Sequence, residues 1–187
     1  MNQTQNITVP HSKTYDITMT ALMAAVTCIL APLSIPIGPV PISFTNLAIY
    51  LSLYLLGWKK GTVSYLIYLL MGFVGLPVFS GFTGGPAKLA GPTGGYIIGF
   101  IFSALVMWAI EHVFGRKPVV QIISMIVGLI VCYAFGTAWF MFAYTRSTGP
   151  VGLMAVLGWC VFPFIIPDLI KIALAYVLSG KVRKYAR

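Results

Sequence analysis

The sequence predicts an all-α integral membrane protein with six transmembrane helices, an outward-facing ligand cavity and both termini in the cytoplasm. Of its 187 residues, 59% are hydrophobic and 8% are charged, and the mean hydropathy is +0.94. A soluble domain carries about 25% charged residues, so this chain lacks the polar surface that a water-soluble fold requires. We expect a single membrane domain over 1–187, made of a polar tail (1–14), a helical bundle (15–180) and a basic tail (181–187).

Six apolar segments, at 16–33, 42–57, 61–76, 95–113, 119–145 and 164–178, are the predicted spans. A span needs about 20 apolar residues, or fewer where protein shields it. Each boundary has a local cause. A Pro-rich loop follows the first segment, Gly57 to Lys60 divides the second from the third, and the Gly-rich stretch 75–95 precedes the fourth. The segment 151–160 is apolar but short, which predicts a half-helix or re-entrant piece before the last span.

The basic residues predict the orientation. With the N-terminus inside, nine Lys and Arg fall in inner segments and two, Lys88 and Arg146, in outer loops. Positively charged loops stay in the cytoplasm, so both termini are predicted to be inside. The net charge of +9 would suggest a nucleic-acid partner in a soluble protein, but these residues lie in short breaks between apolar runs. They indicate topology, and no nucleic-acid partner is expected.

The predicted outer connections are 32–41, 75–95 and 146–152. Together they contain ten Gly and eight Pro, which is 18 of the chain's 31 Gly and Pro residues. Irregular backbone at membrane depth is tolerated where protein covers it or where it lines a cavity. A binding site is therefore expected in the outer half of the bundle. The alternative is that these segments are tight turns, but 75–95 is too long and too rich in Gly for that.

Two charged residues, Asp168 and Lys171, lie inside the last predicted span. Their spacing of three places them on one helix face, and charges inside a span are by default functional. The alternative is a structural ion pair between helices. Pro163 and Pro167 favour a site, because each proline frees a backbone carbonyl.

Hydrogen-bonding and aromatic residues gather in the same outer zone. Thr45 and Asn46 open the second span, and Tyr96 lies at the mouth of the fourth. Phe79 and Trp139 flank the zone and are further candidates for ligand contacts. Each aromatic residue has an alternative role as an interfacial anchor.

No enzyme constellation or metal site is found. His11 and His112 lie away from the outer zone, and the two other carboxylates, Asp16 and Glu111, lie at inner helix ends. No G-x-x-x-x-G-K-[ST] motif for ATP is present, and the three cysteines have no metal-ligand spacing. The sequence thus predicts neither catalytic residues nor a cofactor.

A small-residue motif, Ala21 and Ala25, lies on the first span. An A-x-x-x-A pattern lets another helix approach closely. It indicates either packing inside the bundle or a face on which a partner subunit docks.

Several segments resemble the BioY family, the biotin-capturing S subunits of energy-coupling factor (ECF) transporters. They are PVPISFTN (39–46), GFVGLPVFSGFTGG (72–85), GPTGGY (91–96), and Pro163-Phe164 with Asp168 and Lys171. The resemblance covers nearly the whole chain after residue 15, and GPTGGY in its Gly-rich context is its most specific part.

The resemblance implies a six-helix, multi-pass protein of a prokaryotic plasma membrane that binds biotin from outside with high affinity. Uptake would require a transmembrane coupling subunit, docked at Ala21 and Ala25, and two ATP-binding subunits. The loop 32–41 would act as a lid. Asp168 would accept a ureido N–H, Thr45, Asn46 or a backbone amide would serve the ureido carbonyl, and Lys171 or Arg146 would pair with the ligand carboxylate. Alternatively, Asp168 and Lys171 pair with each other.

Other functions remain open at this stage. An S subunit for another small vitamin would share this architecture. An intramembrane enzyme acting on lipids is disfavoured because one carboxylate supplies no complete mechanism. A stand-alone secondary transporter is disfavoured by the lack of detectable internal repeats.

Overall fold

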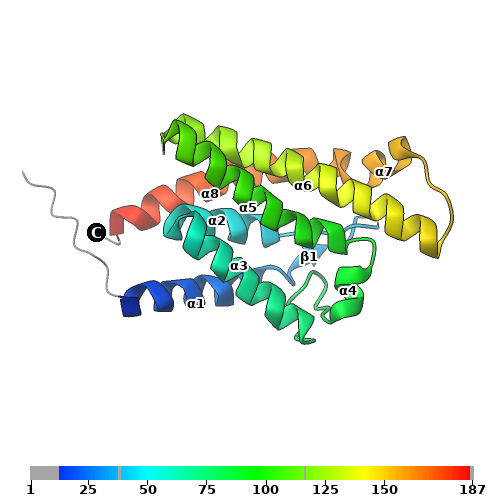
Figure 1. Cartoon of the computed structure of the whole chain (residues 1–187), viewed down its shortest axis with the longest axis horizontal. Helices are drawn as coiled ribbons and strands as arrows, with labels where there is room; N and C mark the ends of the chain where they lie inside the picture. Colours follow the sequence, from blue (N-terminus) through cyan, green and yellow to red (C-terminus); the bar gives the residue numbers. More distant parts are fainter. Residues whose placement is uncertain (1–12, 38, 116, 186–187) are drawn as a thin grey trace, which may run out of the picture.

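Helices that run roughly along the long axis form most of the molecule (Figure 1). The computed structural model describes residues 13–37, 39–115 and 117–185. The elements in this part of the chain are α1 (Lys13–Leu30), β1 (Ser34–Ile35), β2 (Ile42–Ser43), α2 (Thr45–Leu56), α3 (Trp58–Phe73), α4 (Pro86–Ala90), α5 (Gly94–Phe114), α6 (Pro118–Ser147), α7 (Leu153–Cys160) and α8 (Phe162–Tyr185).

Three stretches of the described chain are helical, long and apolar enough to cross a membrane. They are α5, α6 and the segment Leu153–Val182, which joins α7 to α8. The helical nature of the predicted membrane protein is thereby confirmed. The full count of six spans and the cytoplasmic placement of both termini stay predictions.

A helix lies at each of the six predicted spans, with small shifts at the ends. Helix α1 stops at Leu30, ahead of Pro32, and α8 begins at Phe162 and continues through Pro167 to Tyr185. The predicted half-helix at 151–160 is present as α7, separated from α8 by Val161 alone. Except for residues 13 and 14, the predicted polar tail 1–14 lies outside the described residues.

The all-α prediction misses a short antiparallel ribbon. In this ribbon β1 pairs with β2, with Ser34 opposite Ser43 and Ile35 opposite Ile42. The backbone N–H of Gly81 donates to the carbonyl of Pro32 at 3.0 Å, which ties the ribbon's base to the segment between α3 and α4. The irregular connections therefore gather at one end of the bundle, beside α4 (Figure 1).

Glycines set the close packing of α5 against α6. A Cβ atom on Gly136 would lie 2.2 Å from Cδ1 of Tyr96, and one on Gly95 would lie 2.2 Å from Cβ of Trp139. Small residues at a helix crossing let two backbones approach closely in a membrane. Ser103 adds a hydrogen bond by donating from its hydroxyl to the carbonyl of Gly128 at 2.6 Å.

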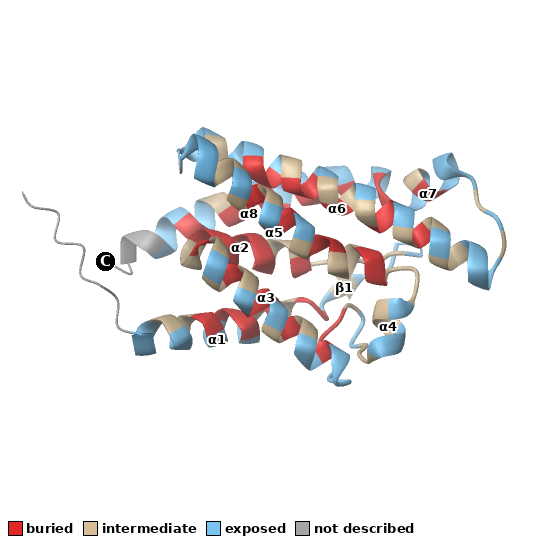
Figure 2. Ribbon diagram, in the orientation of Figure 1, coloured by how far each residue is buried: buried red, intermediate tan, exposed pale blue. Residues whose placement is uncertain are grey.

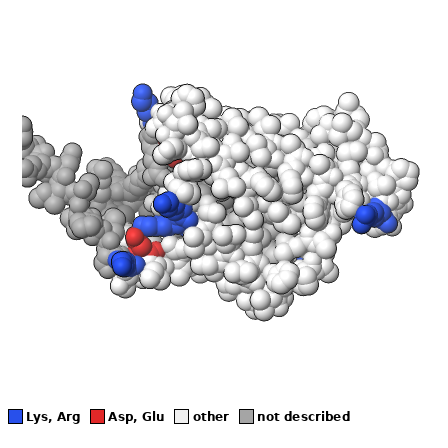
Figure 3. All heavy atoms as spheres, in the orientation of Figure 1, with Lys and Arg blue, Asp and Glu red and all other residues white. Residues whose placement is uncertain are grey.

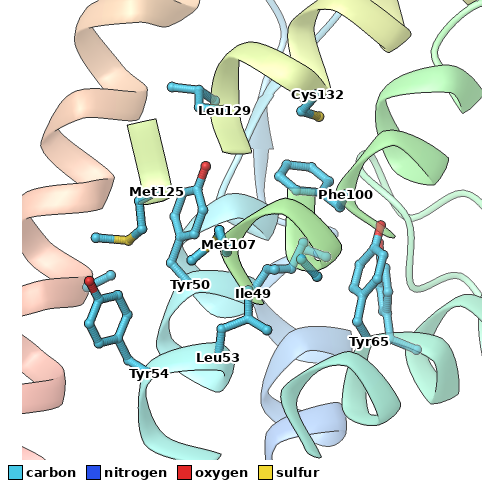
Figure 4. Close-up of a cluster of buried hydrophobic side chains, with 14 of the residues drawn as sticks. Ile49, Tyr50, Leu53, Tyr54, Tyr65, Phe100, Met107, Met125, Leu129 and Cys132 are labelled. Carbon is cyan, nitrogen blue, oxygen red and sulfur yellow. The ribbon is translucent and has the colours of Figure 1, made fainter. Parts of the chain in front are cut away.

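The core is built around aromatic side chains of α2 and α3. Much of α2 is buried (Figure 2). Tyr50 and Tyr68 are among the fully buried side chains, and Phe79 packs edge-on against Tyr68. Figure 4 shows how Tyr50 of α2 meets Met125 and Cys132 of α6 in one cluster. The hydroxyl of Tyr65 donates to the carbonyl of Ile97 at 2.5 Å, which links α3 to α5.

Charged side chains are scarce on the surface around the middle of the molecule. On the face drawn in Figure 3, Lys and Arg lie toward the two ends, and the surface between them is uncharged. Asp16 of α1 pairs with Lys60 of α3, so one of the few acidic residues joins two helices at the end where α1 begins. An uncharged band of this kind is what a hydrocarbon environment requires.

Candidate ligand-binding cavity

A partly enclosed cavity lies at the end of the bundle that carries the β ribbon. Its free volume is about 70 Å³, below the roughly 300 Å³ of typical small-molecule sites. Val40 and Pro41, from the loop between the two strands, form part of that wall. The other lining residues are Ser43, Thr45, Asn46, Tyr68, Ser80, Thr93, Tyr96, Ile97, Phe100, Cys132, Tyr133, Cys160, Phe164, Asp168 and Lys171.

A buried ion pair provides the charges of this cavity. Nζ of Lys171 lies 2.8 Å from Oδ1 of Asp168, and the two residues are 6% and 1% exposed. The hydroxyl of Tyr133 donates to Oδ2 of Asp168 at 2.7 Å. Each carboxylate oxygen therefore has a donor, as a charge taken out of water requires. The pair adds no net charge to the cavity.

Both residues of this pair lie on α8, next to a position where the helix lacks a backbone hydrogen bond. Pro167 lies inside the helix and has no N–H to donate to the carbonyl four residues earlier. That carbonyl belongs to Pro163, as the sequence predicts. Asp168 follows directly, and Lys171 lies on the same helix face one turn later.

Small polar groups line another part of the cavity, at the start of α2. The hydroxyls of Ser43 and Thr45 lie 2.8 Å apart and share a hydrogen bond, and the backbone N–H of Thr45 donates to the Ser43 hydroxyl at 3.4 Å. Asn46 follows in the first turn of the helix, where backbone N–H groups have no helical acceptor. This group can both donate and accept hydrogen bonds.

Tyr96 connects α5 to α6 at the cavity wall. Its ring lies against Gly136, where no side chain intervenes, and its hydroxyl lies 3.1 Å from the hydroxyl of Thr137. The thiol of Cys132 donates to the carbonyl of Tyr96 at 3.5 Å. The lining therefore combines apolar rings and thiols with hydroxyl, amide and charged groups.

The structure brings five of the sequence-predicted site residues together around this cavity: Thr45, Asn46, Tyr96, Asp168 and Lys171. Asp168 and Lys171 also pair with each other there.

Three other predicted site residues do not line the cavity. Phe79 is fully buried in the hydrophobic core, where the absence of a side chain at Gly72 makes room for its ring. The indole N–H of Trp139 donates to the carbonyl of Gly91 at 3.0 Å. The guanidinium of Arg146 stacks over the ring of Phe142 at 4.2 Å.

Tyr133 is the main cavity residue that sequence reasoning missed. Its hydroxyl lies in the middle of an apolar helix, which is an unusual place for a polar group. The chain also has tyrosines within its other helices, such as Tyr50 and Tyr65, and nothing in their spacing singles out the one that faces Asp168. Tyr68 and Phe100 were missed for the same reason.

These features define a class of protein: a helical membrane protein with a small enclosed site, which holds one neutral ion pair and both polar and apolar side chains. The BioY family model matches residues 1–187, and the chain belongs to this family. The relatives below are named as transporters or transporter components, in agreement with the predicted transport function rather than an enzymatic one.

Two relatives are similar over nearly the whole chain. The probable biotin transporter BioY of Pyrococcus horikoshii is 36% identical over 171 residues, which cover 91% of this chain and 98% of the relative. The biotin transporter BioY of Thermotoga maritima is 35% identical over 167 residues, which cover 87% of this chain and 92% of the relative.

Two solved structures share the fold. The crystal structure of an S-component for biotin from an ECF-type ABC transporter superposes with a TM-score of 0.82 at 32% identity, covering 92% of both chains. The S component of a bacterial ECF transporter gives a TM-score of 0.50 at 16% identity, covering 94% of this chain and 96% of that one. The second likeness concerns the fold alone.

Proposed function

We propose that this protein is the biotin-binding S subunit of an ECF-type vitamin transporter in a prokaryotic cell membrane. The observation that carries the proposal is the cavity formed around Asp168, Lys171 and Tyr133, in a chain whose fold matches an S-component for biotin over 92% of its length. The remaining lining combines apolar side chains and thiols with hydroxyls and the amide of Asn46. Biotin combines a polar ureido ring, an apolar thiolane and chain, and an anionic carboxylate, so it needs a lining of this mixed kind.

In the proposed complex each polar group of biotin meets a group of matching chemistry. Asp168 accepts a hydrogen bond from a ureido N–H, and Thr45 or Asn46 donates to the ureido carbonyl. Lys171 pairs with the ligand carboxylate. Tyr96 contacts the ring or chain. Arg146 lies outside the cavity and is left out of this set, as are Phe79 and Trp139.

The proposal includes six membrane spans, formed by α1, α2, α3, α5, α6 and α8, with both termini cytoplasmic. The nine inner basic residues support this orientation. The cavity then opens to the outside, beneath the loop between β1 and β2, and that loop serves as its lid. The small free volume supports a lid that opens when a ligand enters and closes over it.

Transport requires partners in this proposal, because the chain has no phosphate-binding loop for ATP. We propose that the transmembrane coupling subunit docks on the face of α1 that points away from the rest of the bundle. Ala21 and Ala25 are exposed there, whereas Met23 and Ala24 between them are buried. Two small residues one turn apart leave a shallow strip on which another helix can pack closely.

Calorimetric titration of the purified protein tests the ligand. A panel of small vitamins that includes biotin should give saturable binding to biotin alone, and biotin should co-purify with protein produced in its presence. Tight binding of another vitamin with none of biotin would identify an S subunit of different specificity and overturn the proposal.

The docking face is tested by replacing Ala21 and Ala25 with Leu. This variant should bind biotin normally but lose co-purification with the coupling subunit, because the added side chains hold the partner helix away. Ala109, exposed on α5, offers the matched control, and Ala109→Leu should leave co-purification intact. Normal co-purification of the double variant would remove this face from the interface.

A further inference from the structure

A second pocket, here called the vestibule, adjoins the ligand cavity. It lies between the loop that joins β1 to β2, helix α4 and the C-terminal part of α6, and its free volume is about 360 Å³. Thr93 lines both spaces. Pro39 of the vestibule wall directly precedes Val40 and Pro41 of the cavity wall. A ligand that passes beneath this loop into the cavity therefore passes the vestibule.

Lys88 provides the one charge among the described residues that line the vestibule. Its side chain is half-buried, and burial lowers the pKa of its ammonium group, because the charged form is less stable away from water. In the part of the chain that the structure describes, no ion pair joins Lys88 to an acidic residue. A partly desolvated, unpaired ammonium group gains more from a counter-anion than a fully hydrated one does.

Hydrogen bonds on both sides of α4 fix the backbone that carries Lys88. Before the helix, the backbone N–H of Gly85 donates to the carbonyl of Gly72 in α3 at 2.7 Å. After the helix, the indole N–H of Trp139 in α6 donates to the carbonyl of Gly91 at 3.0 Å. The ammonium group is therefore carried by an element that is tied to two long helices, not by a free loop.

The other positive charges near the cavity are less suited to attract an anion. Lys171 is buried and already paired with Asp168, so the cavity has no net charge. Arg146, the second basic residue of the outer connections, is exposed and stacks over Phe142. It lines neither the vestibule nor the cavity. Lys88 is therefore the unpaired cation that borders the way into the cavity.

We propose that the vestibule is an outer binding site for the carboxylate of the incoming ligand, which the ammonium group of Lys88 holds before the ligand enters the cavity. This role rests on the proposed function, because biotin brings the carboxylate. A charge at the rim of a binding site acts mainly on the association rate and on its salt dependence. One ion pair at about 4 Å in water is worth about fivefold in such a rate.

Stopped-flow association of biotin with the full chain in detergent tests this site. At low ionic strength Lys88→Gln should slow association about fivefold, whereas Lys88→Arg, which keeps the charge, should retain the wild-type rate. The matched control is Arg146→Gln, which removes the other outer charge and should slow association less than Lys88→Gln does. Neutral biotinamide should associate equally fast with every variant.

Three results of this experiment would overturn the proposal. An unchanged rate for Lys88→Gln would mean that Lys88 does not hold the ligand. An equal loss in Arg146→Gln would mean that the ligand responds to the general surface charge. An equal loss for biotinamide would give Lys88 a structural role that does not depend on the carboxylate.

A second measurement needs no biotin, so failure of the vestibule site is distinguishable from failure of the proposed function. The full chain is acetylated with a neutral N-hydroxysuccinimide ester, and peptide mass spectrometry compares Lys88 with Lys59, which is exposed at the start of α3. Pentanoate, a short carboxylate, should slow acetylation of Lys88 several-fold relative to chloride at equal ionic strength, and should leave Lys59 unchanged. Equal effects on the two lysines, or none on Lys88, would refute the site even if biotin binds tightly. Protection of Lys88 in a protein that binds no biotin would support the site and assign it to another carboxylate ligand.

Discussion

Asp168→Asn tests the chemistry of the cavity most directly. The substitution preserves the size of the side chain and removes its charge. In the structure both carboxylate oxygens are used, one by Nζ of Lys171 at 2.8 Å and one by the hydroxyl of Tyr133 at 2.7 Å. An amide has one oxygen and replaces the other with an N–H donor, so one of these two donors must lose its acceptor.

The expected loss of affinity follows from the strength of charged hydrogen bonds. A bond to a charged group contributes about 1.5–3 kcal/mol, against about 0.5–1.5 kcal/mol for a neutral pair. Each ureido N–H bound by an amide instead of a carboxylate thus loses about 1.4 kcal/mol, or roughly tenfold in Kd. We expect Asp168→Asn to weaken biotin binding by about 10-fold for one N–H contact and by about 100-fold for two.

Lys171 makes the same experiment sensitive to ligand orientation. The variant leaves a buried ammonium group without its counter-charge, which the carboxylate of biotin can supply. If Lys171 meets that carboxylate, Asp168→Asn should weaken neutral biotinamide more than biotin. Calorimetry with both ligands measures the difference. Unchanged affinity for both ligands would remove Asp168 from the site.

The fold of this variant needs its own control, because a buried charge without a partner destabilises a protein by about 3–5 kcal/mol. Thermal unfolding in detergent should show a lowered Tm for Asp168→Asn. A double variant that also carries Lys171→Met removes the unpaired charge, and its Tm should recover. If the Tm recovers and biotin still fails to bind, the lost affinity belongs to the site and not to unfolding.

Two further predictions use matched variants. Tyr133→Phe removes a hydrogen bond to a buried carboxylate, worth about 1.5–3 kcal/mol, and should lower both Tm and biotin affinity. Tyr50→Phe should lower neither, because the Tyr50 hydroxyl has no hydrogen-bond partner in the described part of the chain. Equal losses in the two variants would contradict a specific role for Tyr133. Gly136→Ala should displace Tyr96, whose ring lies 2.2 Å from the added Cβ, and weaken biotin binding measured by calorimetry. Gly158→Ala, which meets no atom within 4 Å, is its control, and a Gly136→Ala protein with normal affinity would show that Tyr96 need not stay in place.

The sequence predicts the long helices well, because their ends have strong local causes. Helices α5 and α6 lie within two residues of the predicted 95–113 and 119–145, since Gly, Pro and charged residues bound these apolar runs. The ribbon of β1 and β2 could not be predicted. Each strand has two residues, too few to show an alternating pattern.

The membrane environment explains why part of the site was missed. A soluble helix shows its inward face by hydrophobic residues on one side, but a membrane helix is apolar toward lipid and toward the core. Nothing in the α6 sequence therefore shows that Tyr133 turns toward α8 or that Trp139 turns toward Gly91. Asp168 and Lys171 were found because a charge within a span has few tolerable places.

The neutral ion pair has a consequence for selectivity. With Lys171 and Tyr133 satisfying Asp168, the cavity of about 70 Å³ holds no unpaired charge. A ligand that takes Lys171 away from Asp168 must supply a hydrogen-bond donor in return, because an unsatisfied buried carboxylate is costly. An anion without N–H groups can pair with Lys171 but leaves Asp168 without a donor in place of Lys171. Biotin brings both a carboxylate for Lys171 and two ureido donors for Asp168. We therefore expect the pair to select for ligands that carry both a carboxylate and N–H donors. Fatty acids of similar length, which have the carboxylate alone, should fail to compete with biotin in a binding assay, and effective competition by them would refute this account.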